Sequence, residues 1–364
     1  MKKLVVALLA FLVVGVAPAD AATPVVRITD KPHTNFEGEF RDNELASLIT
    51  PEGKLGRVVF NYLGSRKTWV IDPALVDEIA NMADGYSVQG KEDEAGQVAA
   101  QNWLSQLKFV TLNNSVIALP YGNPDQSLAK RLAPSELRLY SQYGKDQLEL
   151  QLGRPVLSQN GWNKGKSRLS YPLQAQYSKN RKLLTGLSTL SSADEITALR
   201  ARLGTVMNPA LDTDDRTYFS DSAVRAVQLM TAKLRVTPGR YQLTSSTAKL
   251  PVTLVNSFDT PTVVSVSLIP MNSRMIVQNV NNVTLAAKSR QQISIEVDVV
   301  APGSTVVIAQ LINSEGRLVG EESRLNLTAT IIDPRVAWFT TGAAALLFVG
   351  AITQSVRRVR RSRK

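Results

Sequence analysis

The sequence contains no cysteine and a single histidine, His33, among its 364 residues. Without cysteine, the chain can form neither disulfides nor thiolate metal sites, and lipid attachment through a cysteine is excluded. Zinc hydrolases generally use several His or Cys ligands, and a Ser-His-Asp nucleophile would depend on His33 with no G-x-S-x-G motif to support it. Neither a Walker loop nor G-x-G-x-x-G occurs. We therefore expect no metal and no cofactor.

The positive charge of the chain is concentrated at its ends. The formal net charge is +11, but removing the two lysines and one aspartate of the first 22 residues and the six basic residues at the C-terminus leaves +4. That is an ordinary surface balance, so the basic composition does not indicate a nucleic-acid partner.

The first 22 residues have the three parts of a secretory signal peptide. Lys2 and Lys3 form the positive start, Leu4 to Val16 the apolar stretch, and Ala19-Asp20-Ala21 the cleavage motif. The alternative is an uncleaved signal anchor, against which the small residues at the cleavage motif argue.

The C-terminal segment 334–356 is predicted to be a transmembrane helix. Its stretch from Val336 to Ile352 carries no charge, and Trp338 lies where an aromatic ring is favoured at the membrane interface. A basic tail over residues 357–364 follows, and flanking Lys and Arg remain cytoplasmic. The topology residues are Arg357, Arg358, Arg360, Arg361, Arg363 and Lys364. We therefore expect a single-pass protein of the cell membrane whose N-terminal domains are extracytoplasmic.

Residues 235–333 are predicted to form an immunoglobulin-like β-sandwich. In the runs Val264 to Leu268, Ile293 to Val299 and Leu325 to Ile331, apolar and polar residues alternate, as in strands with one buried face. Turn sequences such as Ala301-Pro302-Gly303 separate about seven short strands, with no helical pattern between them.

Residues 23–234 are predicted to form a reduced, barrel-like α/β domain. Two segments, Thr68 to Ile71 and Val116 to Leu119, read as buried strands followed by an Asx residue, a proline and a helix. Repeated βα units favour parallel strands with helices packed outside. A further strand is expected near Val156.

The second half of this domain is predicted to be helical after a loop. The stretch Gln159 to Asn180, rich in Asn, Lys, Ser and Tyr, reads as a loop. Ser192-Ala193-Asp194-Glu195 matches a capping box, opening a helix that ends at Gly204. A last helix is expected from Ala223 to Leu234.

Asp72 and Asp125 are weak catalytic candidates. Each follows a predicted parallel strand, where barrel and open-sheet enzymes place catalytic groups, and two carboxylates could act on a glycosidic bond. The structural alternative is that Asp72 before Pro73 is a helix N-cap. By the same argument, Asn123 before Pro124 leaves Asp125 in the first turn of its helix. The structural role is favoured for both.

Aromatic residues provide weak ligand-binding candidates in the same domain. Trp69, Tyr121 and Trp162 could stack on sugar rings together with Trp103, although aromatic residues in a domain of this size usually belong to the core.

Several motifs together resemble a known family. They are TWVIDPALVDEIANMADGY, AAQNWL, VIALPYGNPD and LPVTLVNSFDTPTVVSVSL, followed by the terminal span and basic tail. The chain resembles an uncharacterised actinobacterial family of secreted, C-terminally membrane-anchored proteins, a domain of unknown function often encoded beside the MurJ-type lipid II flippase. The resemblance implies a barrel-like domain related to glycan-active enzymes, an immunoglobulin-like domain and a cell-envelope role. It implies no catalytic residues.

The chain also departs from that family, whose members are usually longer. Its α/β part is shorter than the roughly 250 residues of an eight-unit barrel. A deacetylase activity of the kind found on related barrels needs paired histidines, which the chain lacks.

We therefore expect a non-catalytic binding or scaffold module for a cell-wall glycan or envelope partner. Possible partners are peptidoglycan, its precursors or a flippase-type membrane protein. One alternative is a metal-independent glycan hydrolase that uses carboxylates of the α/β domain. The other is an accessory subunit of a membrane complex.

Overall fold

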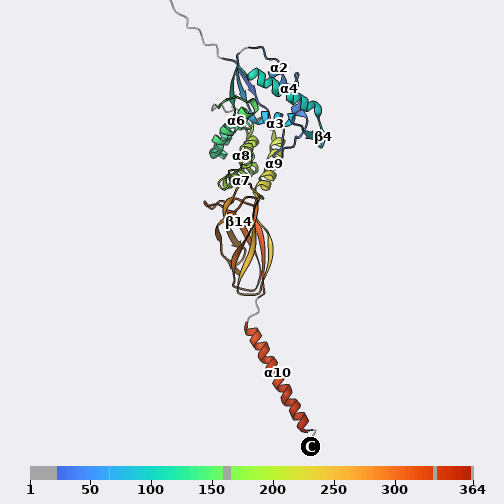
Figure 1. Ribbon diagram of the computed structural model, residues 1–364, viewed down its shortest axis with the longest axis vertical. Helices are drawn as coiled ribbons and strands as arrows, with labels where there is room; N and C mark the ends of the chain where they lie inside the picture. The colour runs from blue at the N-terminus through green and yellow to red at the C-terminus, as the bar shows by residue number, and fades with distance from the viewer. Residues whose placement is uncertain (1–22, 65, 159–164, 331–333, 362–364) are drawn as a thin grey trace, which may run out of the picture.

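The computed structural model describes residues 23–64, 66–158, 165–330 and 334–361, and for residues 334–340 and 356–361 it describes the backbone alone. The predicted signal peptide, Trp162, Arg363 and Lys364 lie outside these residues, as do the side chains of the other four tail arginines. The mixed α/β part followed by a β-sandwich is confirmed. Figure 1 shows the two parts in succession along the long axis of the molecule, with α7, α8 and α9 between the parallel sheet and the sandwich.

The α/β part contains short strands that alternate with longer helices. Its elements are β1 (Val25–Ile28), α1 (Glu44–Ile49), α2 (Lys54–Phe60), β2 (Thr68–Ile71), α3 (Pro73–Ala83), β3 (Ser87–Val88), β4 (Lys91–Glu92), α4 (Glu94–Thr111), β5 (Ser115–Ala118), α5 (Gln126–Leu132), α6 (Leu137–Leu152), β6 (Leu157–Ser158), α7 (Tyr171–Leu187), α8 (Asp194–Arg202) and α9 (Thr213–Thr231). Two 3₁₀ helices, η1 (Pro134–Glu136) and η2 (Leu203–Met207), complete it.

The four strands β1, β2, β5 and β6 form one sheet in chain order, and all three pairs are parallel. Parallel strands that follow one another in this way, with helices between them, are the repeated βα units that the sequence predicted. Trp69 and Ile71 of β2 are fully buried and pack with Trp103 of α4 in the core of this half.

One predicted loop and one predicted helix in this part had wrong boundaries. The stretch read as a loop contains the start of α7, which begins at Tyr171 with Pro172 in its first turn. That helix is mostly polar, although its buried residues Tyr177, Asn180, Leu184 and Leu187 recur every three or four positions. The last helix begins ten residues earlier than predicted, at Thr213, because the Asp212 side chain accepts the N–H of Asp215 and caps it.

The predicted capping box at Ser192 is also wrong. The residue preceding α8 is Ala193, which has no side-chain cap, and the Ser191 hydroxyl accepts the Ala193 N–H instead. The chain continues through Gly204 as the 3₁₀ helix η2, so no helix ends there.

The sandwich consists of two packed sheets. Its strands are β7 (Leu234–Val236), β8 (Gly239–Leu243), β9 (Thr247–Asn256), β10 (Thr262–Pro270), β11 (Met275–Val277), β12 (Val280–Leu285), β13 (Ser289–Val299), β14 (Gly303–Ile312) and β15 (Ser323–Ala329). The strand orders are β12-β10-β14-β15-β8 and β11-β13-β9-β7. All pairs are antiparallel except β15 with β8, and the inward apolar side chains of both sheets form one cluster.

The sandwich core extends into the helices above it. Leu187 of α7 and Ile196 of α8 are fully buried in the same apolar cluster as the sandwich strands, and Met230 of α9 packs against that cluster. The two parts therefore share a continuous apolar junction.

The last described element is α10 (Pro334–Arg361), which includes the predicted span Val336 to Ile352. Among the residues that the structure describes, no helix has the combination of length and hydrophobicity needed to cross a membrane.

Candidate functional site

A polar cavity of the α/β part, built from several elements, lies at the edge of the parallel sheet where β2 and β5 end. We call this space, of about 240 Å³, the sheet-edge cavity. Its wall comes from the first segment after β1, from α3, from the loop after β5, and from α6, α8 and η2. The polar side chains that line it are Thr34, Asp77, Glu78, Asn81, Tyr121, Tyr143, Gln147, Gln151, Arg202 and Thr205.

Asp77 is the carboxylate of this cavity with the most perturbed acidity. Burial raises its pKa to about 6, and the side chains of Gln151 and Tyr121 oppose that rise. Gln151 donates its Nε2 hydrogen to Asp77 Oδ1 at 3.0 Å. At neutral pH the group is therefore mainly ionised, and it is protonated in mildly acidic solution.

The neighbouring Glu78 has a structural role. Its carboxylate accepts the backbone N–H groups of His33 and Thr34 at 3.1 Å and the Thr34 hydroxyl at 2.7 Å. These hydrogen bonds tie the segment after β1 to α3. Since Oε1 alone accepts three of them, they hold the Glu78 carboxylate in a fixed position.

Two aromatic rings and a cation complete the wall. Tyr121 and Tyr143 pack edge to face with ring centroids 5.0 Å apart. Arg202 donates to the carbonyl of Asn35 at 2.7 Å, and its charge lowers the pKa of Asp77. Together with the amides of α6, the cavity offers hydrogen-bond donors and acceptors beside aromatic side chains, groups that a small polar ligand can contact.

The predicted carboxylates Asp72 and Asp125 do not line this cavity. Asp72 is the N-cap of α3, and its Oδ1 accepts the N–H groups of Ala74 at 3.0 Å and of Gly122 at 3.1 Å. Burial raises the pKa of Asp72 to about 8. The carboxylate thus fixes the loop after β5 to the start of α3.

Asp125 is itself the N-cap of α5, which corrects its predicted place in the first turn. Its Oδ1 accepts the Leu128 N–H at 3.0 Å, and its Oδ2 accepts the N–H of Ser167. Asp125 therefore holds the segment before α7 in place. Each of the two carboxylates caps its own helix.

The aromatic candidates fall in three places. Tyr121 lines the cavity, whereas Trp69 is fully buried in the core and Trp162 lies outside the described residues. Trp103 is also buried, and its Nε1 donates to the carbonyl of Leu55 at 3.2 Å.

Most residues of the cavity were not anticipated from the sequence. Asp77 and Arg202 look like ordinary surface charges on amphipathic helices. A usable signal was present in α6, where Tyr143, Gln147 and Gln151 recur every four residues and so lie on one face of the helix.

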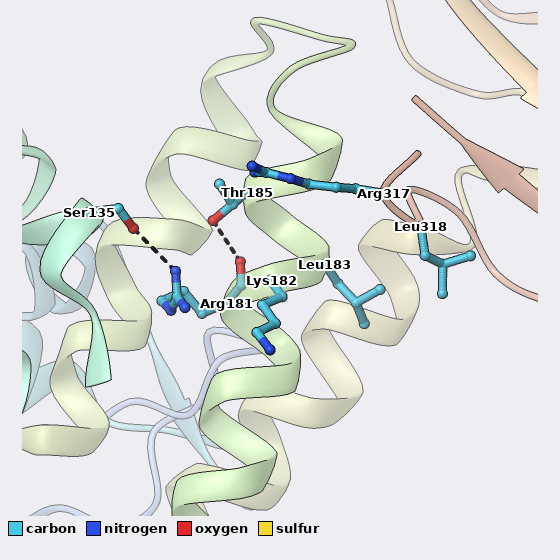
Figure 2. A pocket seen from close by; sticks show the side chains of 7 residues that line it. All are labelled: Ser135, Arg181, Lys182, Leu183, Thr185, Arg317 and Leu318. Atoms are coloured by element: carbon cyan, nitrogen blue, oxygen red, sulfur yellow. Dashed lines mark hydrogen bonds between the residues drawn. The ribbon is translucent and has the colours of Figure 1, made fainter. Parts of the chain in front are cut away.

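A second cleft lies at the junction between the helices and the sandwich. It has a volume of about 590 Å³ and is lined by Ser135, Arg181, Lys182, Leu183, Thr185, Arg317 and Leu318. In Figure 2, Arg317 of the sandwich extends toward Thr185 on α7, and Arg181 points to Ser135. Arg181 Nη1 donates to the Ser135 hydroxyl at 3.1 Å, and Arg317 is paired with Glu315 at 3.1 Å. This junction cleft is cationic, but two of its three cations already have partners.

Comparison with known proteins gives a family match over the second half of the chain. The sequence model of a family of unknown function (DUF6049) matches residues 167–364. That segment runs from just before α7, through the sandwich, to the last residue. No curated protein matches the chain.

Solved structures resemble part of the chain weakly. WR4, an MSP family member of C. elegans, is 15% identical with a TM-score of 0.22, and the match covers 27% of this chain and 99% of that one. The ASH/PapD-like domain 7 of human CEP192 is 11% identical with a TM-score of 0.22, covering 28% and 89%. Native alpha-2-macroglobulin of Escherichia coli is 15% identical with a TM-score of 0.22, covering 27% and 16%. At these TM-scores, none of the three supports a conclusion about function.

Proposed function

The chain belongs to a family of unknown function (DUF6049), and we propose that it is a membrane-anchored cell-envelope protein that binds a glycan without cleaving it. The α/β part provides the binding site in its sheet-edge cavity, and the sandwich connects that part to the anchor. The observation that carries the proposal is the composition of the cavity wall.

The size and chemistry of the cavity suit a sugar unit. Its volume of about 240 Å³ accommodates roughly one ring. Asp77 and Gln151 offer acceptors and donors for hydroxyl groups, and the half-buried Tyr143 ring offers apolar surface for the C–H side of a sugar. These groups are held on α3 and α6, and Asp72 fixes the start of α3 to the loop after β5, so the site is preorganised.

The arrangement favours binding over hydrolysis. Glycoside hydrolysis normally uses two carboxyl groups on opposite sides of the scissile bond. Asp77 could serve as the acid, since its pKa is near 6. The second carboxylate of the cavity, Glu78, is occupied by hydrogen bonds from His33 and Thr34.

The proposed anchor is α10, with the N-terminal parts outside the membrane and the basic tail inside. Leu346, Leu347 and Phe348 expose 70% or more of their surface, so this stretch of helix needs a lipid or protein environment. If that environment is protein, the chain is an accessory subunit of a membrane complex. Small residues at Gly342 and Ala343 would allow close helix packing there.

The test is binding of soluble peptidoglycan fragments to the full chain in lipid nanodiscs, followed by calorimetry. We expect Asp77→Asn to weaken binding at least tenfold, which corresponds to about 1.4 kcal/mol. We expect Asp146→Asn, an exposed carboxylate on α6, to leave affinity unchanged. Affinity of the unmodified protein should also fall as the pH drops through about 6, since Asp77 then becomes protonated.

Two outcomes would overturn the proposal. One is that no glycan fragment binds the unmodified chain. The other is that the unmodified chain cleaves glycan fragments while the Asp77→Asn variant binds them without cleavage. The second result would establish the hydrolase alternative, with Asp77 as its acid.

A further inference from the structure

The one histidine of the chain lies beside two carboxylates that do not line the sheet-edge cavity. A ring nitrogen of His33 and carboxylate oxygens of Asp42 and Glu44 all lie within 4.8 Å of one another. Asp42 and Glu44 are exposed at the start of α1, and His33 is 3% exposed. Donor atoms bound to one divalent transition metal at about 2.1 Å each lie within roughly 4.2 Å of one another, so small side-chain rotations bring the three groups into range.

The backbone holds this group of side chains together. The Arg41 N–H donates to the His33 carbonyl at 3.1 Å, and Thr34 forms an antiparallel bridge with Phe40. The intervening turn is closed by Asn35, whose side-chain oxygen accepts the N–H groups of Glu37 and Glu39. This hydrogen-bonded turn therefore places Asp42 next to His33.

A second observation points independently to a ligand. Nε2 of His33 is buried and has no hydrogen-bond partner among the described residues. A buried polar atom left unpaired costs about 1 to 3 kcal/mol, so nearly all such atoms in folded proteins are paired. The backbone N–H of His33 is bound by Glu78, which fixes the position of the residue.

The surrounding charges allow a cation to enter. Lys31 Nζ lies 3.0 Å from Glu44 Oε2 and 3.5 Å from Asp215 Oδ2. A divalent cation can replace Lys31 at Glu44, because Lys31 keeps Asp215 as a counter-charge. Arg41 also pairs with Asp215, so that carboxylate remains neutralised throughout.

We propose that His33, Asp42 and Glu44 bind a divalent transition-metal ion, with zinc as the preferred metal. One imidazole and two carboxylates make a three-ligand zinc site that leaves a further position for water. The imidazole selects zinc over calcium and magnesium, which prefer oxygen ligands alone. The metal joins the segment after β1 to the start of α1 and stiffens the backbone that Glu78 binds at the cavity.

The test uses the full chain without a histidine tag. Since His33 is the only histidine, every imidazole signal in a ¹H–¹⁵N NMR spectrum comes from it. We expect zinc chloride to shift these signals and calorimetry to give one bound zinc per chain. His33→Gln should abolish this binding, and Asp42→Asn and Glu44→Gln should each weaken it tenfold or more.

The controls distinguish specific zinc binding from non-specific attraction of zinc to surface carboxylates and from misfolding of the variants. Glu52→Gln changes an exposed carboxylate on the same surface segment and should leave zinc affinity unchanged. Asp42→Asn and Glu44→Gln alter exposed side chains, so their circular dichroism spectra should match that of the unmodified chain. Unchanged imidazole signals on adding zinc, or equal zinc affinity in His33→Gln, would overturn the proposal. Because the readout is metal binding, its result does not depend on glycan binding.

Discussion

The two halves of this molecule bury different kinds of side chain. Among the described residues, every buried charged residue lies in the α/β half. They are Asp72, Glu78, Asp125, Glu136, Asp215 and Arg216. The sandwich buries only neutral polar groups among its apolar ones, such as Asn256 and Thr305. Buried charge is costly and persists where hydrogen bonds or an ion pair hold it, so in the α/β half it marks the contacts that fasten loops and helices to one another.

The largest expected effect comes from a buried ion pair of the α/β half. Glu136 is 1% exposed and pairs with Arg200 at 2.8 Å, while Ser135 and Thr185 donate to its other oxygen. Glu136→Ala leaves the Arg200 charge without its partner, and we expect the free energy of unfolding to fall by about 3 to 5 kcal/mol. Urea denaturation followed by tryptophan fluorescence measures this, because Trp69 and Trp103 lie in that half and the sandwich strands contain no tryptophan.

The matched change in the sandwich is Leu254→Ala. Leu254 is fully buried among apolar side chains, so its truncation should cost about 2 to 5 kcal/mol through the cavity that it leaves. This loss should not vary with pH between 4 and 8. If the loss of stability in Leu254→Ala depended strongly on pH, this would contradict the proposed difference between the two halves, namely that buried charged groups stabilise only the α/β half.

An intermediate effect is expected from the titration of Asp72. Its pKa is about 8 in the folded protein and near 3.8 otherwise, so the folded state holds the proton more tightly. The contribution of Asp72 to the free energy of unfolding should therefore be greatest below about pH 4 and should decrease as the pH rises toward 8. Asp72→Asn keeps the acceptor for Ala74 and Gly122 but cannot ionise.

We expect the stability of Asp72→Asn to exceed that of the unmodified chain at pH 8 by at least about 1.4 kcal/mol, the equivalent of one pKa unit. The measurement is a series of urea denaturations between pH 4 and 8. If the difference between the two proteins is the same at every pH, the buried carboxylate does not titrate in this range and the prediction is wrong.

The smallest effect is expected at an exposed pair of the sandwich. Lys249 on β9 and Glu296 on β13 lie 3.5 Å apart, with 72% and 50% of their side-chain surfaces exposed. Lys249→Ala should change the free energy of unfolding by less than about 1 kcal/mol, because water and salt screen the pair. Thermal unfolding in low and high salt checks this, and a loss comparable with that of Glu136→Ala would contradict the comparison.

The sandwich was the more predictable half because its signal is local. Alternation in Ile293 to Val299 directly reports which side chains point inward, and those residues lie in β13. In the α/β half, β2, β5 and the strand near Val156 were also predicted, whereas α7 was missed because its residues are mainly polar.

The candidate site was less predictable, because it depends on contacts between distant segments. Tyr121 was anticipated only as one of several aromatic residues that could stack on a sugar ring. Asp77 was not, since nothing near it in the sequence shows that Gln151 reaches it from α6. The cluster at His33 was not predicted for a different reason. A single histidine does not indicate a metal site in the sequence, and only the structure shows that two carboxylates lie beside it.

The junction between the halves has a mechanical consequence. Only Ala232 and Lys233 separate the end of α9 from β7, and Leu187 and Ile196 are embedded in the sandwich core. The helices are therefore coupled to the sheet β11-β13-β9-β7 through its edge strand β7. This shared core and short connection set the orientation of the α/β half relative to the sandwich, and with it the orientation of the proposed binding site.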